Sequence, residues 1–136
     1  MRAGLFAAAA VAAALTGCGG DDDKKTPTTG ASRVDVAQAG TKARADAQNA
    51  SLALEACYAE NQDYTTCGTP EVLDRAGVEL GKEPGQVEIS DPKPTSYKLT
   101  AYVTGGKGFS IEKAEDGTMK RSCDAPPEAG CMNETW

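Results

Sequence analysis

The segment SYKLTAYVT, residues 96–104, alternates apolar and polar side chains with a period of two. Its apolar residues therefore share one face of an extended strand: Tyr97, Leu99, Ala101 and Val103. Such alternation is typical of a strand that packs one face on a core and exposes the other face to solvent. The segment predicts a strand of an antiparallel sheet.

The same period continues on both sides of this segment and predicts three further strands. These runs are carried by Val87 and Ile89, by Phe109 and Ile111, and by residues 118–123. Gly105-Gly106 and Asp116-Gly117 separate successive runs, and both dipeptides favour hairpin turns. We therefore expect a four-stranded antiparallel meander with one apolar face, in which Pro92 and Pro94 lengthen the first connection.

Residues 33–60, upstream of the strands, are predicted to form one long helix. Ser32 is suited to be its N-cap, and Asp35 brings negative charge to the first turn, where it is favoured. Gly40 is the only helix-breaking residue before Asn61-Gln62-Asp63, where we expect the helix to end.

One stripe of this helix is small and apolar, and polar side chains such as Asp46 fall mostly off it. The stripe follows helical spacing through Ala43, Ala47, Ala50, Leu54 and Cys57. No other predicted element is large enough to cover the sheet, because residues 69–73 suggest only a short turn capped by Thr69 and 78–84 read as a loop. The expected fold class is α+β, with the long helix packed on the meander.

The N-terminal residues have the features of a lipoprotein signal peptide. Arg2 supplies a positive charge, residues 3–15 form an apolar stretch of signal-peptide length, and Leu15-Thr16-Gly17-Cys18 resembles a lipobox. The alternatives are an ordinary secretory signal that contains a cysteine and a prepilin leader, which would need a Gly-Phe type site. We predict that Cys18 is lipid-modified and holds the mature chain on the outer face of the cell membrane.

Three segments follow from these predictions. Residues 1–17 form the signal peptide, residues 18–32 form the lipidated cysteine with a hydrophilic tether, and residues 33–136 form a single domain. The mature chain has a formal charge of −7, because Arg2 is the only charged residue removed. Nucleic acid is therefore an unexpected partner. The chain contains no histidine, the commonest general base, and we predict no catalytic, cofactor-binding or metal-binding residues.

Four cysteines remain once Cys18 is assigned to the lipid: Cys57, Cys67, Cys123 and Cys131. In an exported chain they are expected to form two disulfides. Three connectivities are possible, and we favour the local pairs Cys57–Cys67 and Cys123–Cys131. A four-cysteine zinc site is the alternative, but zinc cysteines usually come as pairs with two to four residues between them.

The order of several short motifs resembles the head domain of type IV pilins and pseudopilins of Gram-positive bacteria. These motifs cover about residues 33–131: Glu55-Ala56-Cys57-Tyr58, Tyr64-Thr65-Thr66-Cys67, Ser96-Tyr97-Lys98-Leu99-Thr100-Ala101, Gly108-Phe109-Ser110-Ile111, Asp116-Gly117-Thr118, Lys120-Arg121-Ser122-Cys123 and Gly130-Cys131. The resemblance implies a helix on a meander sheet, with the C-terminal cysteine loop at the edge of the sheet.

The resemblance fails at the N-terminus, where a pilin helix begins with an apolar half that forms the filament core. This chain has a lipobox and a hydrophilic tether there instead. We therefore expect a non-enzymatic surface lipoprotein that is an accessory of a type IV pilus or pseudopilus system and contacts pilin or assembly proteins. The alternative is a stand-alone lipoprotein that binds a small ligand or a glycan.

Overall fold

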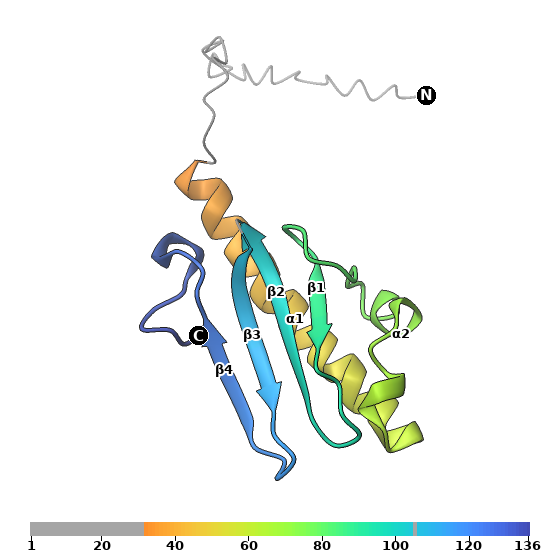
Figure 1. The fold of residues 1–136 in the computed structure, drawn as a ribbon. Helices are drawn as coiled ribbons and strands as arrows, with labels where there is room; N and C mark the ends of the chain where they lie inside the picture. Colours follow the sequence, from red (N-terminus) through yellow and green to blue (C-terminus); the bar gives the residue numbers. More distant parts are fainter. Residues whose placement is uncertain (1–31, 105) are drawn as a thin grey trace, which may run out of the picture.

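The computed structural model describes residues 32–104 and 106–136, and the fold is α+β (Figure 1). Its elements are α1 (Arg33–Asn61), η1 (Tyr64–Thr66), α2 (Pro70–Asp74), β1 (Val87–Ser90), β2 (Tyr97–Thr104), β3 (Lys107–Lys113), β4 (Met119–Cys123) and η2 (Pro127–Ala129). Our predictions for the signal peptide, Cys18 and the tether through Ala31 lie outside the described residues.

The four strands form one antiparallel sheet in the order β1-β2-β3-β4, which confirms the predicted meander. Leu99 of β2 stands between Ile89 of β1 and Ile111 of β3 in the register, so the apolar positions line up across the sheet. The last strand starts at Met119, one residue later than predicted. The Thr118 backbone N–H instead donates to the Asp116 carboxylate at 2.8 Å in the turn.

Helix α1 lies across one face of the sheet and buries its stripe of small residues there (Figure 1). Four of the five predicted stripe positions are buried: Ala43, Ala47, Ala50 and Leu54. Cys57 is only partly buried, and its disulfide partner Cys67 takes the core position instead. Alanine on the helix lets it approach the sheet closely enough for the larger strand side chains to fill the space between them.

Both ends of α1 are capped by side chains or backbone. Ser32 is the N-cap, as predicted, and forms a capping box in which it and Asp35 bond each other's backbone N–H groups, both at 3.2 Å. At the other end Gln62 takes a left-handed conformation with φ 57°, and its N–H donates to Tyr58 O. The helix runs one residue further than predicted, to Asn61.

Asp46 departs from the prediction, because it is buried although the pattern places it off the stripe. Lys42, one helical turn earlier, reaches over it and pairs with its carboxylate. A buried carboxylate needs such a partner, and helical spacing of four residues provides it.

The connection between α2 and β1 is more ordered than a loop. Val78 is buried, and Leu80 forms a parallel bridge with Val87. Val87 N–H donates to Glu79 O at 2.8 Å, and Gly81 N–H donates to Val87 O at 2.9 Å. These bonds cover part of the β1 edge of the sheet. Thr69 precedes α2 as predicted but makes no side-chain capping bond.

Gly40, predicted only as a helix breaker, lies at a close contact between α1 and the C-terminal cysteine loop. A Cβ atom at this position would lie 2.0 Å from Ala129 O and 2.6 Å from the Ala129 carbonyl carbon. Ala129 belongs to η2 and is itself buried. The absence of a side chain at Gly40 therefore allows the loop to rest directly on the helix backbone.

None of the helices within the described ranges is both long enough and apolar enough to cross a membrane.

Candidate functional site

The four cysteines of the described chain form the two local disulfides that the spacing favours. Cys57 is bonded to Cys67 and Cys123 to Cys131, with S–S distances of 2.01 and 2.03 Å and Cα–Cα distances of 5.8 Å in both. The bonded sulfurs are not arranged as a zinc site. Over residues 32–104 and 106–136 no group of three or more His, Cys, Asp or Glu side chains could hold a metal ion.

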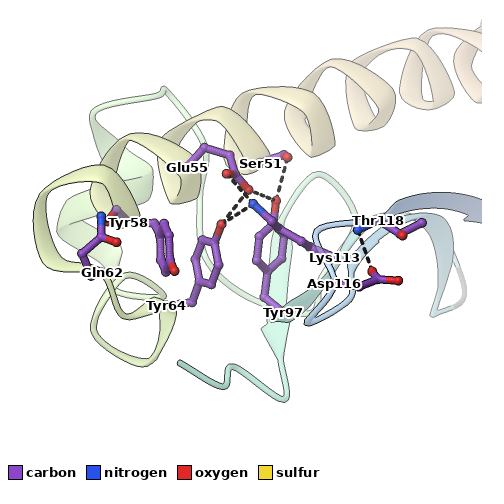
Figure 2. Close-up of polar contacts among 9 residues, drawn as sticks. All are labelled: Ser51, Glu55, Tyr58, Gln62, Tyr64, Tyr97, Lys113, Asp116 and Thr118. Carbon is purple, nitrogen blue, oxygen red and sulfur yellow. Dashed lines mark hydrogen bonds and ion pairs between the residues drawn. The ribbon is translucent and has the colours of Figure 1, made fainter. Parts of the chain in front are cut away.

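A group of hydrogen-bonded polar side chains, which we call the Lys113 cluster, includes Tyr64 from the loop that the Cys57–Cys67 disulfide closes (Figure 2). Its members are Ser51 and Glu55 of α1, Tyr64 of η1, Tyr97 of β2 and Lys113 of β3. The long helix, the loop closed by Cys57–Cys67 and the sheet meet here. The cluster therefore links these three parts of the fold through polar side chains.

Lys113 is at the centre of this cluster. Its ammonium donates to Glu55 Oε2 and to the Tyr64 hydroxyl, both at 2.7 Å. The hydroxyls of Tyr64 and Tyr97 in turn donate to Glu55 Oε1 at 2.9 and 3.2 Å. Tyr97 also shares a bond of 2.8 Å with the Ser51 hydroxyl. Each polar group thus has at least one partner, which is what burial at a junction requires.

These contacts shift the pKa values of the cluster. Burial opposes the charge on Glu55, but the hydrogen bonds from Lys113 and Tyr64 outweigh it and hold the pKa of Glu55 below its usual value. Burial likewise opposes the charge on Lys113, yet its bonds to Glu55 and Tyr64 raise the pKa of the ammonium. Burial, aided by the nearby Glu55 charge, raises the pKa of Tyr97. All three shifts favour the charge states in which Glu55 and Lys113 are paired.

Aromatic packing fixes the position of the cluster further. Tyr58 and Tyr64 stack with ring centroids 4.3 Å apart, and Tyr64 meets Tyr97 edge-on at 4.8 Å. The Lys113 ammonium lies 5.2 Å from the Tyr64 ring centroid, within cation–π range. A lysine and tyrosines with raised pKa values are poor proton donors at neutral pH. The arrangement favours a structural role for the cluster over acid–base chemistry.

The sequence contained a signal for this cluster that our prediction did not use. Lys113 follows Phe109 and Ile111 at the same period of two, so it continues the apolar face of its strand. A lysine at an inward position needs hydrogen-bond acceptors, and a carboxylate would also balance its charge. That Glu55 and Tyr64 supply these acceptors depends on tertiary structure, because these residues are 58 and 49 positions away.

A groove runs between α1 and α2 on the side of the helix that faces away from the sheet. Its volume is about 490 Å³, and its floor is mainly apolar. It is lined by Asn49, Leu52, Ala53, Ala56, Cys57, Glu60, Asn61, Val72, Arg75 and Ala76. This volume lies within the range of ligand pockets in proteins, about 300–1,000 Å³. We call it the α1–α2 groove.

No protein-family model, no curated protein and no solved structure matches this chain. The candidate surfaces must therefore be judged by their own geometry. The loop closed by Cys123–Cys131 is largely committed to internal packing, since Ala129 rests on Gly40 and the Arg44 guanidinium lies close to Gly130. Two accessible surfaces of the described residues are the α1–α2 groove and the edge of the sheet at β4.

Proposed function

We propose that this chain is a lipid-anchored, non-enzymatic interaction protein on the outer face of the cell membrane. The observation that carries the proposal is the pairing of the cysteines. Two disulfides use four of the five cysteines in the chain. The fifth, Cys18, directly follows small residues and an apolar stretch, where a thiol would receive a diacylglyceryl group. Two or more acyl chains would then anchor the protein stably.

The absence of enzymatic activity is supported by the state of the polar side chains. The chain contains no histidine. Glu55 and Lys113, two groups whose pKa values are shifted, are bonded to each other and to tyrosines. Groups that are satisfied internally and have pKa values shifted away from neutrality are poorly suited to transfer protons to a substrate.

We further propose that the domain acts as an accessory of a type IV pilus or pseudopilus system. The support is the resemblance of the motifs, together with a long helix on a meander sheet and a disulfide at each end. A hydrophilic tether of the predicted length would span about 20 Å if it behaved as a coil. Such a reach would keep the domain close to the membrane, where it would contact pilin subunits or assembly proteins before or during assembly.

A second candidate function is the binding of a small ligand or glycan. The α1–α2 groove favours it, because its volume of about 490 Å³ and its mixed lining are those of a ligand site. The two candidates predict different partners for the same anchored domain.

Two experiments test the proposal in order. Metabolic labelling with palmitate should label the protein, and Cys18→Ala should abolish labelling and release a soluble product; unchanged labelling would refute the anchor. Crosslinking in intact cells with mass spectrometry should then recover pilin-type subunits or assembly proteins. If these are missing and the protein binds a small molecule or glycan with micromolar affinity, the second candidate replaces the pilus role.

A further inference from the structure

Strand β4 forms one edge of the sheet, and its register with β3 determines which backbone groups face outward. Asp124 N–H donates to Gly108 O at 3.1 Å, and Ala114 N–H donates to Thr118 O at 2.9 Å. Both bonds use even-numbered residues at the two ends of β4, and hydrogen-bonded positions alternate along an antiparallel ladder. The odd-numbered residues of β4 therefore direct their N–H and C=O groups away from β3.

Only one end of this edge is covered. Cys123 N–H, at an odd position, donates to Glu134 O at 3.0 Å, and the C-terminal segment lies beside the corresponding end of β4 (Figure 1). The other two odd positions, Met119 and Arg121, form no backbone hydrogen bond at this edge to any residue that the structure describes. These groups form an open strand edge, the usual template for pairing with another chain.

A depression of about 340 Å³ lies on the helix-facing side of this open edge. It is lined by Gln48, Ser51, Leu52, Ile111, Met119 and Arg121. Leu52 is 68% exposed and Met119 is 46% exposed, so two large apolar side chains flank it in solvent. Open backbone groups beside an apolar depression are the two features by which a sheet edge recognises an added strand, because backbone bonds supply affinity and alternate side chains enter the depression.

The charge at the edge indicates the chemistry of the added strand. Lys120 and Arg121 are consecutive and exposed in a chain with a formal charge of −6. Neither forms an ion pair with another described residue. Arg121 lies 5.0 Å from the Trp136 ring centroid, and Glu112 is the cross-strand neighbour of Lys120. Because consecutive strand residues point to opposite faces, an added strand whose apolar side chains enter the depression would direct its carboxylates to the face of Lys120, while Arg121 borders the depression and adds positive charge nearby.

Two other occupants fit this edge less well. A second copy, paired antiparallel about a two-fold axis at Lys120 or Arg121, would place that residue opposite its own copy, and like charges directly opposite are destabilising. Residues 19–31 of the chain itself contain aspartates but no large apolar side chain to enter the depression.

We propose that the β4 edge binds an extended segment of a partner protein in which acidic and apolar side chains alternate, adding a fifth strand beside Met119 and Arg121. The proposal rests on the proposed role as an interaction protein, and it names the surface and the chemistry of the partner segment.

The test uses the mature chain in detergent micelles and a fluorescein-labelled nine-residue peptide of alternating valine and glutamate. Fluorescence anisotropy should show saturable binding. The double variant Lys120→Glu, Arg121→Glu should weaken binding at least tenfold. The matched control Lys98→Glu, Lys107→Glu makes the same change in net charge at exposed positions of β2 and β3, and it should weaken binding less than threefold.

A backbone variant separates strand addition from charge attraction. Met119→Pro removes an N–H that faces the open edge and leaves the β3 ladder bonds intact, so binding should be lost while the circular dichroism spectrum stays unchanged. If this variant fails to fold, the charge variants decide.

Four results would overturn the proposal: no saturable binding, equal binding of a valine–lysine peptide, equal weakening by the control, or tenfold tighter binding after deletion of residues 19–31. The last would identify the chain's own tether as the occupant. Failure of the peptide test leaves the palmitate and crosslinking results unaffected, so the two proposals can fail separately.

Discussion

The two halves of α1 are held to the rest of the chain in different ways, although each lies beside a disulfide of similar loop size. The C-terminal half is fixed by hydrogen bonds, through Glu55 to Lys113, Tyr64 and Tyr97. The N-terminal half is fixed by shape, through the direct approach of Ala129 to Gly40. One attachment depends on charge and direction, and the other on the absence of a side chain.

This difference shows two ways in which a small core can be supplemented. Hydrogen bonds between charged and phenolic groups respond to pH and to loss of a single partner. A close backbone contact responds only to added volume. A variant in the hydrogen-bonded half should therefore not change the response to added volume at Gly40. A variant at Gly40 should not change the pH dependence of stability.

The largest effects are expected from removal of the disulfides. Cys57→Ala with Cys67→Ala, and Cys123→Ala with Cys131→Ala, open loops with sequence separations of 10 and 8. Loop closure of this size stabilises a folded chain by about 2.5 kcal/mol, so each pair of substitutions should lower the free energy of unfolding by about that amount. Urea unfolding without reductant measures it. If the two losses of unfolding free energy differ by more than about 1 kcal/mol, loop closure alone does not explain them. The native contacts around each disulfide would then decide the difference.

The next effect is expected at the shape-dependent half. Gly40→Ala places a methyl group 2.0 Å from Ala129 O, so η2 must move away from the helix. Overpacking of this kind costs about 1–3 kcal/mol, and the helix propensity of alanine offsets about 1 kcal/mol. We expect a net loss of about 0–2 kcal/mol, measured by thermal and urea unfolding.

The reverse substitution at an exposed position is the control. Ala45→Gly removes a methyl group from solvent-facing α1, and it should cost about 1 kcal/mol through propensity alone. If Gly40→Ala instead stabilises the chain, the close approach of Ala129 does not limit the side chain at this position. The claim that shape fixes the N-terminal half of α1 would then be wrong.

The contrast between Gly40 and the strands explains which parts of the fold could be predicted. Period-two alternation around Leu99 and the small-residue stripe through Ala47 depend on local spacing, so both were confirmed. Gly40 stands three residues before Ala43 on the same stripe, yet its role depends on Ala129, which is 89 positions later. Local patterns place a residue on a face, but they do not identify its distant neighbour.

A smaller effect is expected at the hydrogen-bonded half. Lys113→Met keeps roughly the length of the side chain but removes the ammonium group. The hydrogen bonds that this group donates to Glu55 and Tyr64 are then lost. The Lys113 side chain is 18% exposed and that of Glu55 is 36% exposed, so solvent screens part of the pair. We expect a loss of about 1 kcal/mol. A double-mutant cycle with Glu55→Gln should give a coupling energy of similar size, and a coupling near zero would show that the pair contributes no stability.

The smallest expected effect is a change in pH dependence. The pKa of Glu55 is lowered in the folded chain, because hydrogen bonds from Lys113 and Tyr64 outweigh the effect of burial. Its contribution to stability is therefore present above the unfolded pKa, near 4.5, and is lost as the pH falls through the folded pKa. Glu55→Gln should flatten the decline of unfolding free energy below pH 4.5, measured by urea unfolding between about pH 2.5 and 6. The control is Glu112→Gln, at an exposed position of β3. Below pH 4.5 the unfolding free energy of this variant should fall more steeply than that of Glu55→Gln.

At alkaline pH the same cluster acts through Lys113. Its pKa is raised, since the bonds to Glu55 and Tyr64 exceed the opposing effect of burial. Its contribution is present below the unfolded pKa and lost as the pH rises through the folded one. Wild type should therefore lose more stability than Lys113→Met above pH 10.5. Gly40→Ala should follow wild type in both pH ranges, because the shape-dependent half contains no member of the cluster.

The candidate sites differ in how far sequence reasoning could reach them. The local disulfide pairing, favoured from the spacing of the four cysteines, is confirmed. The open edge at Met119 and Arg121 could be predicted only as the end of a meander, because its exposure depends on where Glu134 bonds to Cys123. The α1–α2 groove required the position of α2, and no periodic pattern encodes the angle of a five-residue helix.

The order β1-β2-β3-β4 also has a kinetic consequence. Each strand pairs with the strand that precedes or follows it in the chain, and each disulfide joins consecutive cysteines of the domain. All of these pairings close short loops, which form quickly and with little loss of entropy. A chain with this order of strands and cysteines can form its native pairings one after another along the sequence. We therefore expect an oxidant to be sufficient for its maturation, with no reshuffling of wrongly paired cysteines.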